Sequence, residues 1–155
     1  MSINLALNKP TNQSSFVLPY SGQRTVDGST APISRWLCNS PPCWVSVDLG
    51  AVFTIDRWVV RHMAVIPGWP SPGYTMSDFS LQSSMDNMSW QDVDVVSRNS
   101  SSVTDRTVQA FQARYLRVMV TGGLQINEEL ASIVEFEVYQ AQPEPSRGVP
   151  FQVLE

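Results

Sequence analysis

The fold is decided by the stretch 131–139, Ala-Ser-Ile-Val-Glu-Phe-Glu-Val-Tyr. Its side chains alternate with a period near two, which is typical of a strand with one covered face. Glu135 places a carboxylate inside this strand, and a buried carboxylate is costly unless it is paired or bound to a metal. The upstream segment 24–29, Arg-Thr-Val-Asp-Gly-Ser, is a candidate metal partner. Together the two segments indicate a metal-clamped β-sandwich that displays loops, and so a binding module more than an enzyme.

The rest of the chain also indicates an all-β protein. Strand-like runs rich in Val, Ile, Phe, Tyr and Trp are separated by turn residues, and no long stretch has helical periodicity. These runs cover 44–49, 54–62, 78–84, 90–96, 115–121 and 133–139. Several short strands with polar loops favour a sandwich or barrel. We assign residues 1–140 to one domain and the Pro-rich residues 141–155 to a flexible tail or linker.

Composition excludes several functions. Only 15% of the residues are charged, the net charge is −4, and Lys9 is the single lysine. Nucleic-acid binding needs clustered cations, and docking on anionic lipid needs them too, so both are disfavoured. The chain has one His, no Gly-x-Ser-x-Gly motif and no Gly-rich phosphate loop. We therefore expect no enzymatic activity.

Two cysteines lie in the short segment Cys38-Asn-Ser-Pro-Pro-Cys43. A disulfide can close such a loop if the two Cβ atoms face each other. A zinc site is disfavoured because the chain offers only two thiols and one His. We predict a disulfide between Cys38 and Cys43, which implies an oxidising compartment and a secreted or extracellular protein.

An ordered series of short motifs runs from about residue 4 to residue 140. The motifs are Asn4-Leu-Ala-Leu-Asn-Lys-Pro10, Thr25-Val-Asp-Gly28, Arg35-Trp36, Trp44-Val-Ser-Val-Asp-Leu-Gly50, Ser83–Trp90, Arg114-Tyr-Leu-Arg117 and the stretch 133–139. In order and spacing the series resembles discoidin domains, also called coagulation factor V/VIII type C domains, and most closely the family 32 carbohydrate-binding modules. The resemblance implies a discoidin-like jelly-roll β-sandwich, a fold whose members bind sugars, phospholipid surfaces or other proteins.

The resemblance also implies one structural calcium ion. The implied ligands are the carbonyls of Arg24, Ser29 and Val134, the carboxylates of Asp27 and Glu135, and oxygen atoms of Ser34. Such a set suits calcium, which takes six to eight oxygen ligands. The alternative is an Asp-Gly turn at Asp27 and a surface carboxylate at Glu135.

The resemblance places a ligand site on loops at one end of the sandwich. Arg61 stands where the family often has a sugar-contacting arginine, and His62 follows it. The long loop 64–76 carries Trp69 and Tyr74, and Asn39 lies in the cysteine loop. Aromatic faces pack on the apolar patches of a pyranose, and arginine offers paired donors to its hydroxyls.

Two of the ligand candidates have a plain structural alternative. Arg61 could be an ordinary strand-end cation, and alternation could turn His62 inward. We assign the remaining tryptophans to the core: Trp36, Trp44, Trp58 and Trp90.

The function predicted from the sequence is that of a non-catalytic carbohydrate-binding module or lectin. It would recognise terminal sugars, with galactose-type sugars as the first expectation from the resemblance. The alternative is a discoidin-type adhesion domain that binds a protein partner or a phospholipid surface through Trp69 and Leu37.

Overall fold

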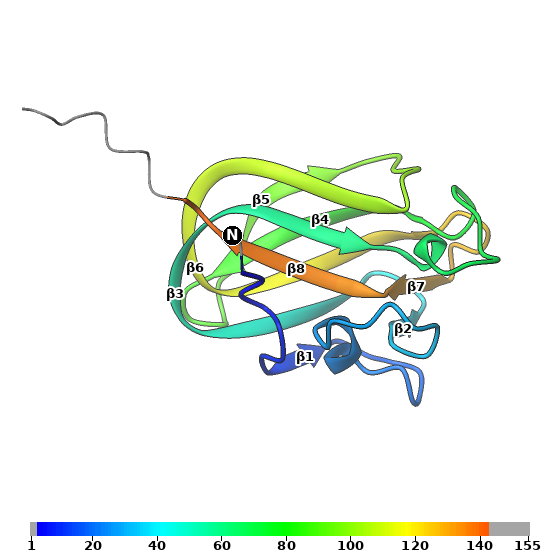
Figure 1. Ribbon diagram of the computed structural model, residues 1–155, viewed down its shortest axis with the longest axis horizontal. Coiled ribbons are helices and arrows are strands. Elements are labelled where there is room, and N and C mark those ends of the chain that lie inside the picture. The colour runs from blue at the N-terminus through cyan, green and yellow to red at the C-terminus, as the bar shows by residue number, and fades with distance from the viewer. Residues whose placement is uncertain (1–2, 143–155) are drawn as a thin grey trace, which may run out of the picture.

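Two long strands organise the fold in the computed structural model, which describes residues 3–142. They are β3 (Cys43–Arg61) and β6 (Val103–Leu124), paired antiparallel with irregularities between Asp48 and Phe53 and between Ile55 and Arg57. Figure 1 shows that both strands curve round at one end of the molecule, so their two halves face each other across the core. Both ends of β3 therefore reach the opposite end, where the long loops lie.

The shorter elements complete two sheets. The larger sheet has the order β1-β3-β6-β4-β5, with β8 paired to β3, and the smaller sheet contains β2 and β7. The short strands are β1 (Thr11–Gln13), β2 (Trp36–Asn39), β4 (Met76–Ser84), β5 (Gln91–Val96), β7 (Leu130–Ile133) and β8 (Glu135–Gln140). Two short 3-10 turns are η1 (Gly22–Thr25) and η2 (Met63–Val65). No helix among residues 3–142 is long and apolar enough to cross a membrane.

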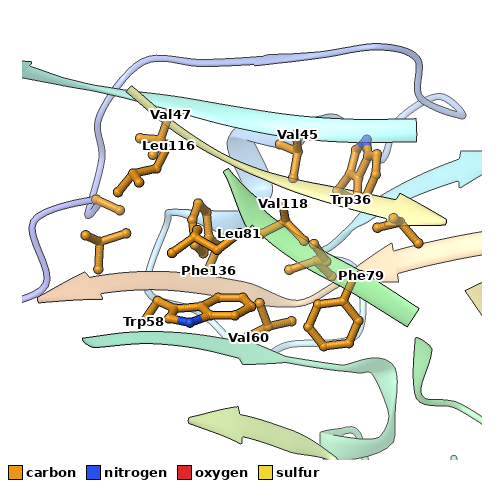
Figure 2. Packing of buried hydrophobic residues seen from close by; sticks show 14 of the residues in the cluster. Trp36, Val45, Val47, Trp58, Val60, Phe79, Leu81, Leu116, Val118 and Phe136 are labelled. Atoms are coloured by element: carbon orange, nitrogen blue, oxygen red, sulfur yellow. The ribbon is translucent and has the colours of Figure 1, made fainter. Parts of the chain in front are cut away.

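The core lies between the two halves of the long strands (Figure 2). Trp58 packs edge-on against Phe79 with ring centroids 6.1 Å apart. Other fully buried side chains come from most strands: Trp36, Val45, Val47, Val60, Leu81, Leu116, Val118 and Phe136. Each such side chain stabilises the fold by roughly 1.5–3 kcal/mol relative to leaving it exposed.

The predicted all-β fold class is confirmed, but several strands differ from the prediction. The stretch 131–139 is not one strand, because it divides at Val134 between β7 in the smaller sheet and β8 in the larger sheet. The predicted run 115–121 is only the second half of β6, which begins at Val103. The predicted runs 44–49 and 54–62 are two halves of one strand, because the backbone stays paired on either side of Gly50, which has a φ of 86°. Most of the predicted tail, residues 143–155, lies outside the described residues.

Of the four tryptophans that were predicted to lie in the core, two are buried there and two are not. Trp36 and Trp58 are fully buried. Trp44 and Trp90 are only partly buried, and the Arg117 guanidinium lies 5.4 Å from the Trp44 ring centroid and 4.2 Å from that of Trp90. Strand alternation explains Trp44, because its neighbour Val45 faces the core and turns Trp44 to the outer face.

Candidate functional site

Three loops meet at the end of the sandwich where β3 begins and ends. The Ile126 amide donates to Gly73 O at 2.8 Å, which joins loop 125–129 to loop 64–75. The Ser40 amide donates to Glu129 O at 2.7 Å, which joins loop 125–129 to the cysteine loop. Gly123 permits this arrangement, since a Cβ there would lie 2.2 Å from Leu130 O.

Four side chains stack at this end of the molecule. The rings of Trp69 and Tyr74 are stacked, with centroids 5.7 Å apart and planes 21° from parallel. The Arg35 guanidinium lies 5.1 Å from the Trp69 ring centroid and 4.2 Å from that of Tyr20. We call Tyr20, Arg35, Trp69 and Tyr74 the aromatic–arginine column. A surface hollow of about 400 Å³ runs beside Trp69 along residues 64–70.

Short backbone bonds hold the loop that carries two members of the column. The Trp69 amide donates to Ile66 O at 3.2 Å, and the Tyr74 amide donates to Pro70 O at 3.2 Å. The Ala64 amide in turn donates to Tyr74 O at 3.1 Å, so the loop closes on its own base. Trp69 and Tyr74 are both partly exposed. The column can therefore offer apolar ring faces together with the donors of a guanidinium group.

Sequence reasoning named Trp69 and Tyr74 but missed Tyr20 and Arg35 as site residues. Both come from the segment between β1 and β2, far from loop 64–76 in the sequence. The sequence held only a weak indication that Arg35 faces the surface. This residue precedes the buried Trp36, and extended chain turns neighbouring side chains to opposite sides. No pattern could show which ring would receive the guanidinium.

His62 does not belong to a surface site, so the prediction of ligand contact is wrong for this residue. It is fully buried, its Nε2 lies 2.9 Å from Thr104 Oγ1, and its Nδ1 accepts from the Met76 amide at 3.3 Å. Because Nδ1 accepts, the proton sits on Nε2 and is donated to Thr104. Burial lowers the pKa of His62 to about 3, so the ring is neutral. Alternation along β3 turns His62 inward, which is the alternative that the sequence left open for this residue.

Arg61 ends β3 but is committed to an ion pair. Its Nε donates to Glu137 Oε2 at 2.6 Å, and this hydrogen bond raises the pKa of Arg61 above its usual range. Tyr139 donates its hydroxyl to the other Glu137 oxygen at 2.6 Å. These contacts favour the alternative of a strand-end cation and leave Arg61 outside the aromatic–arginine column.

Asn39 lies at the same end as the column. It is exposed at the end of β2, where it pairs with Leu130 of β7 beside loop 125–129. The structure thus places the cysteine loop at the predicted end, while ligand contact by Asn39 stays a prediction.

Most of the predicted metal ligands converge. Ser34 Oγ donates to Asp27 Oδ2 and lies 3.3 Å from Arg24 O. Glu135 is 2% exposed, and its Oε1 accepts from the Gly28 amide at 3.0 Å. Burial, together with a hydrogen bond and repulsion from Asp27, raises the pKa of Glu135 to about 9. Two carboxylates are thus held together, and in the part of the chain that the structure describes neither forms an ion pair.

This oxygen cluster fits a calcium ion. Within residues 3–142 no three His, Cys, Asp or Glu side chains gather, so hydroxyl and carbonyl oxygens would have to complete the coordination. Calcium accepts such ligands, whereas zinc favours nitrogen and sulfur. Ser29 donates its amide to Asp27 Oδ1 at 2.9 Å, and Val134 is buried next to Glu135. Arg24, Asp27 and Ser34 are therefore joined directly, and Glu135 reaches the same turn through the Gly28 amide, while ligation by the carbonyls of Ser29 and Val134 stays a prediction.

The predicted disulfide is not formed in the structure, where Cys38 and Cys43 are both buried free thiols. Burial raises the pKa of the Cys43 thiol, and a hydrogen bond with Cys38 raises it further. Cys38 Sγ also lies 3.0 Å from Ser15 Oγ. The turn brings the two sulfur atoms together as predicted, and the difference lies in their oxidation state.

Comparisons with known proteins agree with this fold. The family model of the F5/F8 type C group described as "NedA-like, galactose-binding domain" matches residues 24–118. No curated protein sequence matches the chain.

Solved structures are also similar. Chitosan-binding module 1 from a chitosanase/glucanase of Paenibacillus sp. IK-5 is 30% identical, with a TM-score of 0.74 over 88% of this chain and 98% of that one. Module 2 of that enzyme, in complex with chitotriose, is 29% identical, with a TM-score of 0.72 over 88% and 99% of the two chains. The family 32 module from Streptococcus pneumoniae EndoD is 18% identical, with a TM-score of 0.79 over 90% and 100%, and supports the fold alone.

Proposed function

The chain belongs to the F5/F8 type C family, in its NedA-like galactose-binding group, and we propose that it is a non-catalytic carbohydrate-binding module. One observation carries the proposal: Trp69 and Tyr74 are stacked and partly exposed beside a hollow of about 400 Å³. Ring faces of this kind pack against the C–H patch of a pyranose, and Arg35 adds donors for hydroxyl oxygens. Terminal sugars would bind on the loops at this end of the sandwich.

The finer identity of the sugar is part of the proposal. The family description supports a galactose-type sugar, which was the expectation from the sequence. Two similar modules are described as binding chitosan, so amino sugars are a second class to test. A module that targets polysaccharides would act outside the cell, as part of a longer enzyme or as a separate lectin.

Calcium in the Asp27–Glu135 cluster is a further part of the proposal. The ligands would be Arg24, Asp27, Ser29, Ser34, Val134 and Glu135. A bound ion would offset the repulsion between two carboxylates that now rest on one hydroxyl and one amide. Its role would be to hold the segment 24–35 in place, since no acid–base chemistry is needed for sugar binding.

The adhesion alternative has less support. It required Trp69 and Leu37 to project as apolar contacts. The Trp69 ring is stacked on Tyr74 and lies 5.1 Å from the Arg35 guanidinium, so it does not project as an isolated apolar side chain. Leu37 lies within β2, and its amide donates to Tyr20 O at 3.1 Å.

A glycan array tests the proposed function. One shallow site should bind with a Kd on the order of mM to tens of μM, so the domain is best presented as a multivalent conjugate. We expect the calcium-loaded domain to bind a defined set of terminal sugars.

Matched variants locate the site in the same screen. Binding should be lost in Trp69→Ala and Tyr74→Ala and kept in Tyr115→Ala, an aromatic substitution on β6 outside the column. Absence of signal from the folded wild type on every glycan would contradict the proposal.

A further inference from the structure

A buried imidazole joins the two ends of the loop that carries the ring stack. His62 lies directly before η2, and Met76 is the first residue of β4, so the two residues flank the loop that holds Trp69 and Tyr74. The Met76 amide donates to His62 Nδ1 at 3.3 Å, and both residues are fully buried. The imidazole therefore connects the start of this loop to its end.

Hydrogen bonds continue from His62 in one closed cycle. His62 Nε2 donates to Thr104 Oγ1 at 2.9 Å, and this hydroxyl donates to Asn99 Oδ1 at 3.4 Å. Asn99 Nδ2 donates to the Met76 carbonyl at 3.1 Å, so the cycle begins and ends on the backbone of Met76. Its direction is set, because the Met76 amide can only donate and the carbonyl can only accept. We call His62, Thr104 and Asn99 the buried network.

The backbone of Asn99 supports the same loop from below. Its carbonyl accepts a hydrogen bond from Gln125 Nε2. The same nitrogen of Gln125 donates to Thr75 Oγ1 at 3.1 Å, and Thr75 is fully buried directly after Tyr74 in the chain. Asn99 is thus connected to the end of the loop through both its side chain and its main chain.

The buried network lies beneath the surface that a sugar could reach. His62 is fully buried, Thr104 is 5% exposed and Asn99 is 9% exposed. The Asn99 amide is also saturated, since Nδ2 donates to Ser101 O at 3.2 Å and Oδ1 accepts from the Ser101 amide at 3.3 Å. A buried polar group left without a partner is costly, so a fully bonded network favours one arrangement of the loop ends. Any effect of the network on binding must therefore pass through the loop.

We infer that His62, Thr104 and Asn99 are positioning residues for the proposed sugar site. By fixing both ends of the loop, the buried network holds Trp69 and Tyr74 in their stacked arrangement before a sugar arrives. Preorganisation of this kind raises affinity, because less conformational entropy is lost on binding. The inference rests on the proposed function, since it assigns what holds the binding loop in place.

Thr104 offers a matched pair of substitutions. Thr104→Val keeps the shape of the side chain and leaves His62 Nε2 without an acceptor, whereas Thr104→Ser keeps the hydroxyl. Hydrogen exchange of the sugar-free domain, measured by mass spectrometry on peptides that cover residues 63–76, reports on the loop directly. We expect exchange about tenfold faster than wild type in Thr104→Val and unchanged in Thr104→Ser.

The glycan array measures the effect on binding. Thr104→Val should weaken binding about tenfold on every glycan that wild type binds, as a concentration series on the array would show. The rank order of the glycans should stay the same, because the substituted side chain does not reach the sugar. Thr104→Ser should bind as wild type does.

Ser84→Ala controls for the loss of a buried hydroxyl elsewhere. Ser84 is 4% exposed at the other end of β4, and its Oγ accepts from the Asn87 amide at 2.9 Å. This variant should be less stable than wild type, with loop exchange and array binding unchanged. If Thr104→Val does not fold, Asn99→Ala takes its place, because it breaks the buried network at the bond to Met76.

The outcomes separate the inference from the function on which it rests. Wild-type loop exchange in Thr104→Val overturns the inference, and so does faster exchange with unchanged array binding. A changed rank order of glycans overturns it as well, since that result requires direct contact with the sugar. All three leave the proposed function standing. A folded wild type that binds no glycan contradicts the proposed function and the inference together.

Discussion

Ser34 and Arg35 are adjacent in sequence but serve different sites. Ser34 Oγ is hydrogen-bonded to Asp27 in the oxygen cluster, and the Arg35 guanidinium lies 4.2 Å from the Tyr20 ring centroid in the column. Arg24 has the same dual position, with its carbonyl 3.3 Å from Ser34 Oγ and its side chain beside Tyr20. Anything that fixes the oxygen cluster therefore also fixes Arg35 of the column and Arg24 beside it.

Calcium should stabilise the domain through this cluster. At a hundredfold excess over its Kd, an ion bound only to the folded state adds about 2.7 kcal/mol, or roughly 5–10 °C in Tm for a chain of this size. Thermal denaturation in CaCl2 and in EDTA measures the difference. Asp27→Asn should abolish the rise, and Asp92→Asn on β5 should keep it. Equal Tm values in CaCl2 and EDTA would rule the ion out.

Calcium removal should also weaken sugar binding, because the ligand segment 24–35 carries Arg24 and Arg35. We expect a several-fold loss of affinity in EDTA at a temperature where the domain remains folded. A sugar identified on the array is titrated into the domain while near-UV circular dichroism is recorded, so that one sample reports both the affinity and the fold. Unchanged affinity in EDTA would show that the column is independent of the cluster.

His62 should make the protein less stable in acid. Its pKa is about 3 in the folded protein and about 6.5 when exposed, so the unfolded state binds a proton first as pH falls. The contribution is complete above about pH 6.5, shrinks as pH falls, and levels off below about pH 3. The free energy of unfolding that is lost through His62 between pH 6.5 and pH 4.5 is about 2–3 kcal/mol.

Urea unfolding of wild type and His62→Gln at several pH values isolates this contribution, because the carboxylates are common to both proteins. The difference between the two should narrow as pH falls. The imidazole NMR signals of the folded wild type should also stay in the neutral form down to pH 5. A titration of His62 near pH 6.5 in the folded protein would contradict the buried position.

The two thiols should form a disulfide under an oxidant, although slowly, because burial raises the pKa of the Cys43 thiol and keeps its reactive thiolate scarce. Cys38 and Cys43 are in hydrogen-bond contact, and closing so short a loop should add about 2 kcal/mol to the free energy of unfolding. Thiol counting in denaturant should find two groups after reduction and none after mild oxidation. Cys43→Ser should gain no stability from the oxidant. If both thiols are still counted in wild type after oxidation, the two cysteines do not form a disulfide and the prediction is wrong.

Arg117 should contribute to stability through packing more than through charge. It lies between Trp44 and Trp90, and its Nε donates to Gln82 Oε1 at 2.7 Å. Arg117→Ala should cost about 1–2 kcal/mol in urea unfolding, because the ring contacts and this bond are lost together. Arg98→Ala should cost little, and sugar binding should be unchanged in both. A loss of binding in Arg117→Ala at full stability would extend the site onto the outer face.

Much of the fold could be predicted because strand periodicity is local. The stretch 131–139 correctly indicated strand structure around Glu135, although it divides between β7 and β8, and the β-rich runs identified most of the longer strands. The limits appear where a strand bends, since only pairing with β6 keeps residues 43–61 in one strand. The same limit explains Trp44, whose outward direction follows from the register of β3 and not from its hydrophobicity.

The sequence by itself determined the all-β class, the family, the two segments of the oxygen cluster and two aromatic members of the column. These features depend on residue type and spacing, which are written along the chain. Only the tertiary structure decided that Arg35 and Tyr20 complete the column, that Arg61 pairs with Glu137, and that His62 is buried. Those outcomes depend on which loops meet when β3 and β6 curve round, and contacts between distant segments arise only when the whole core packs.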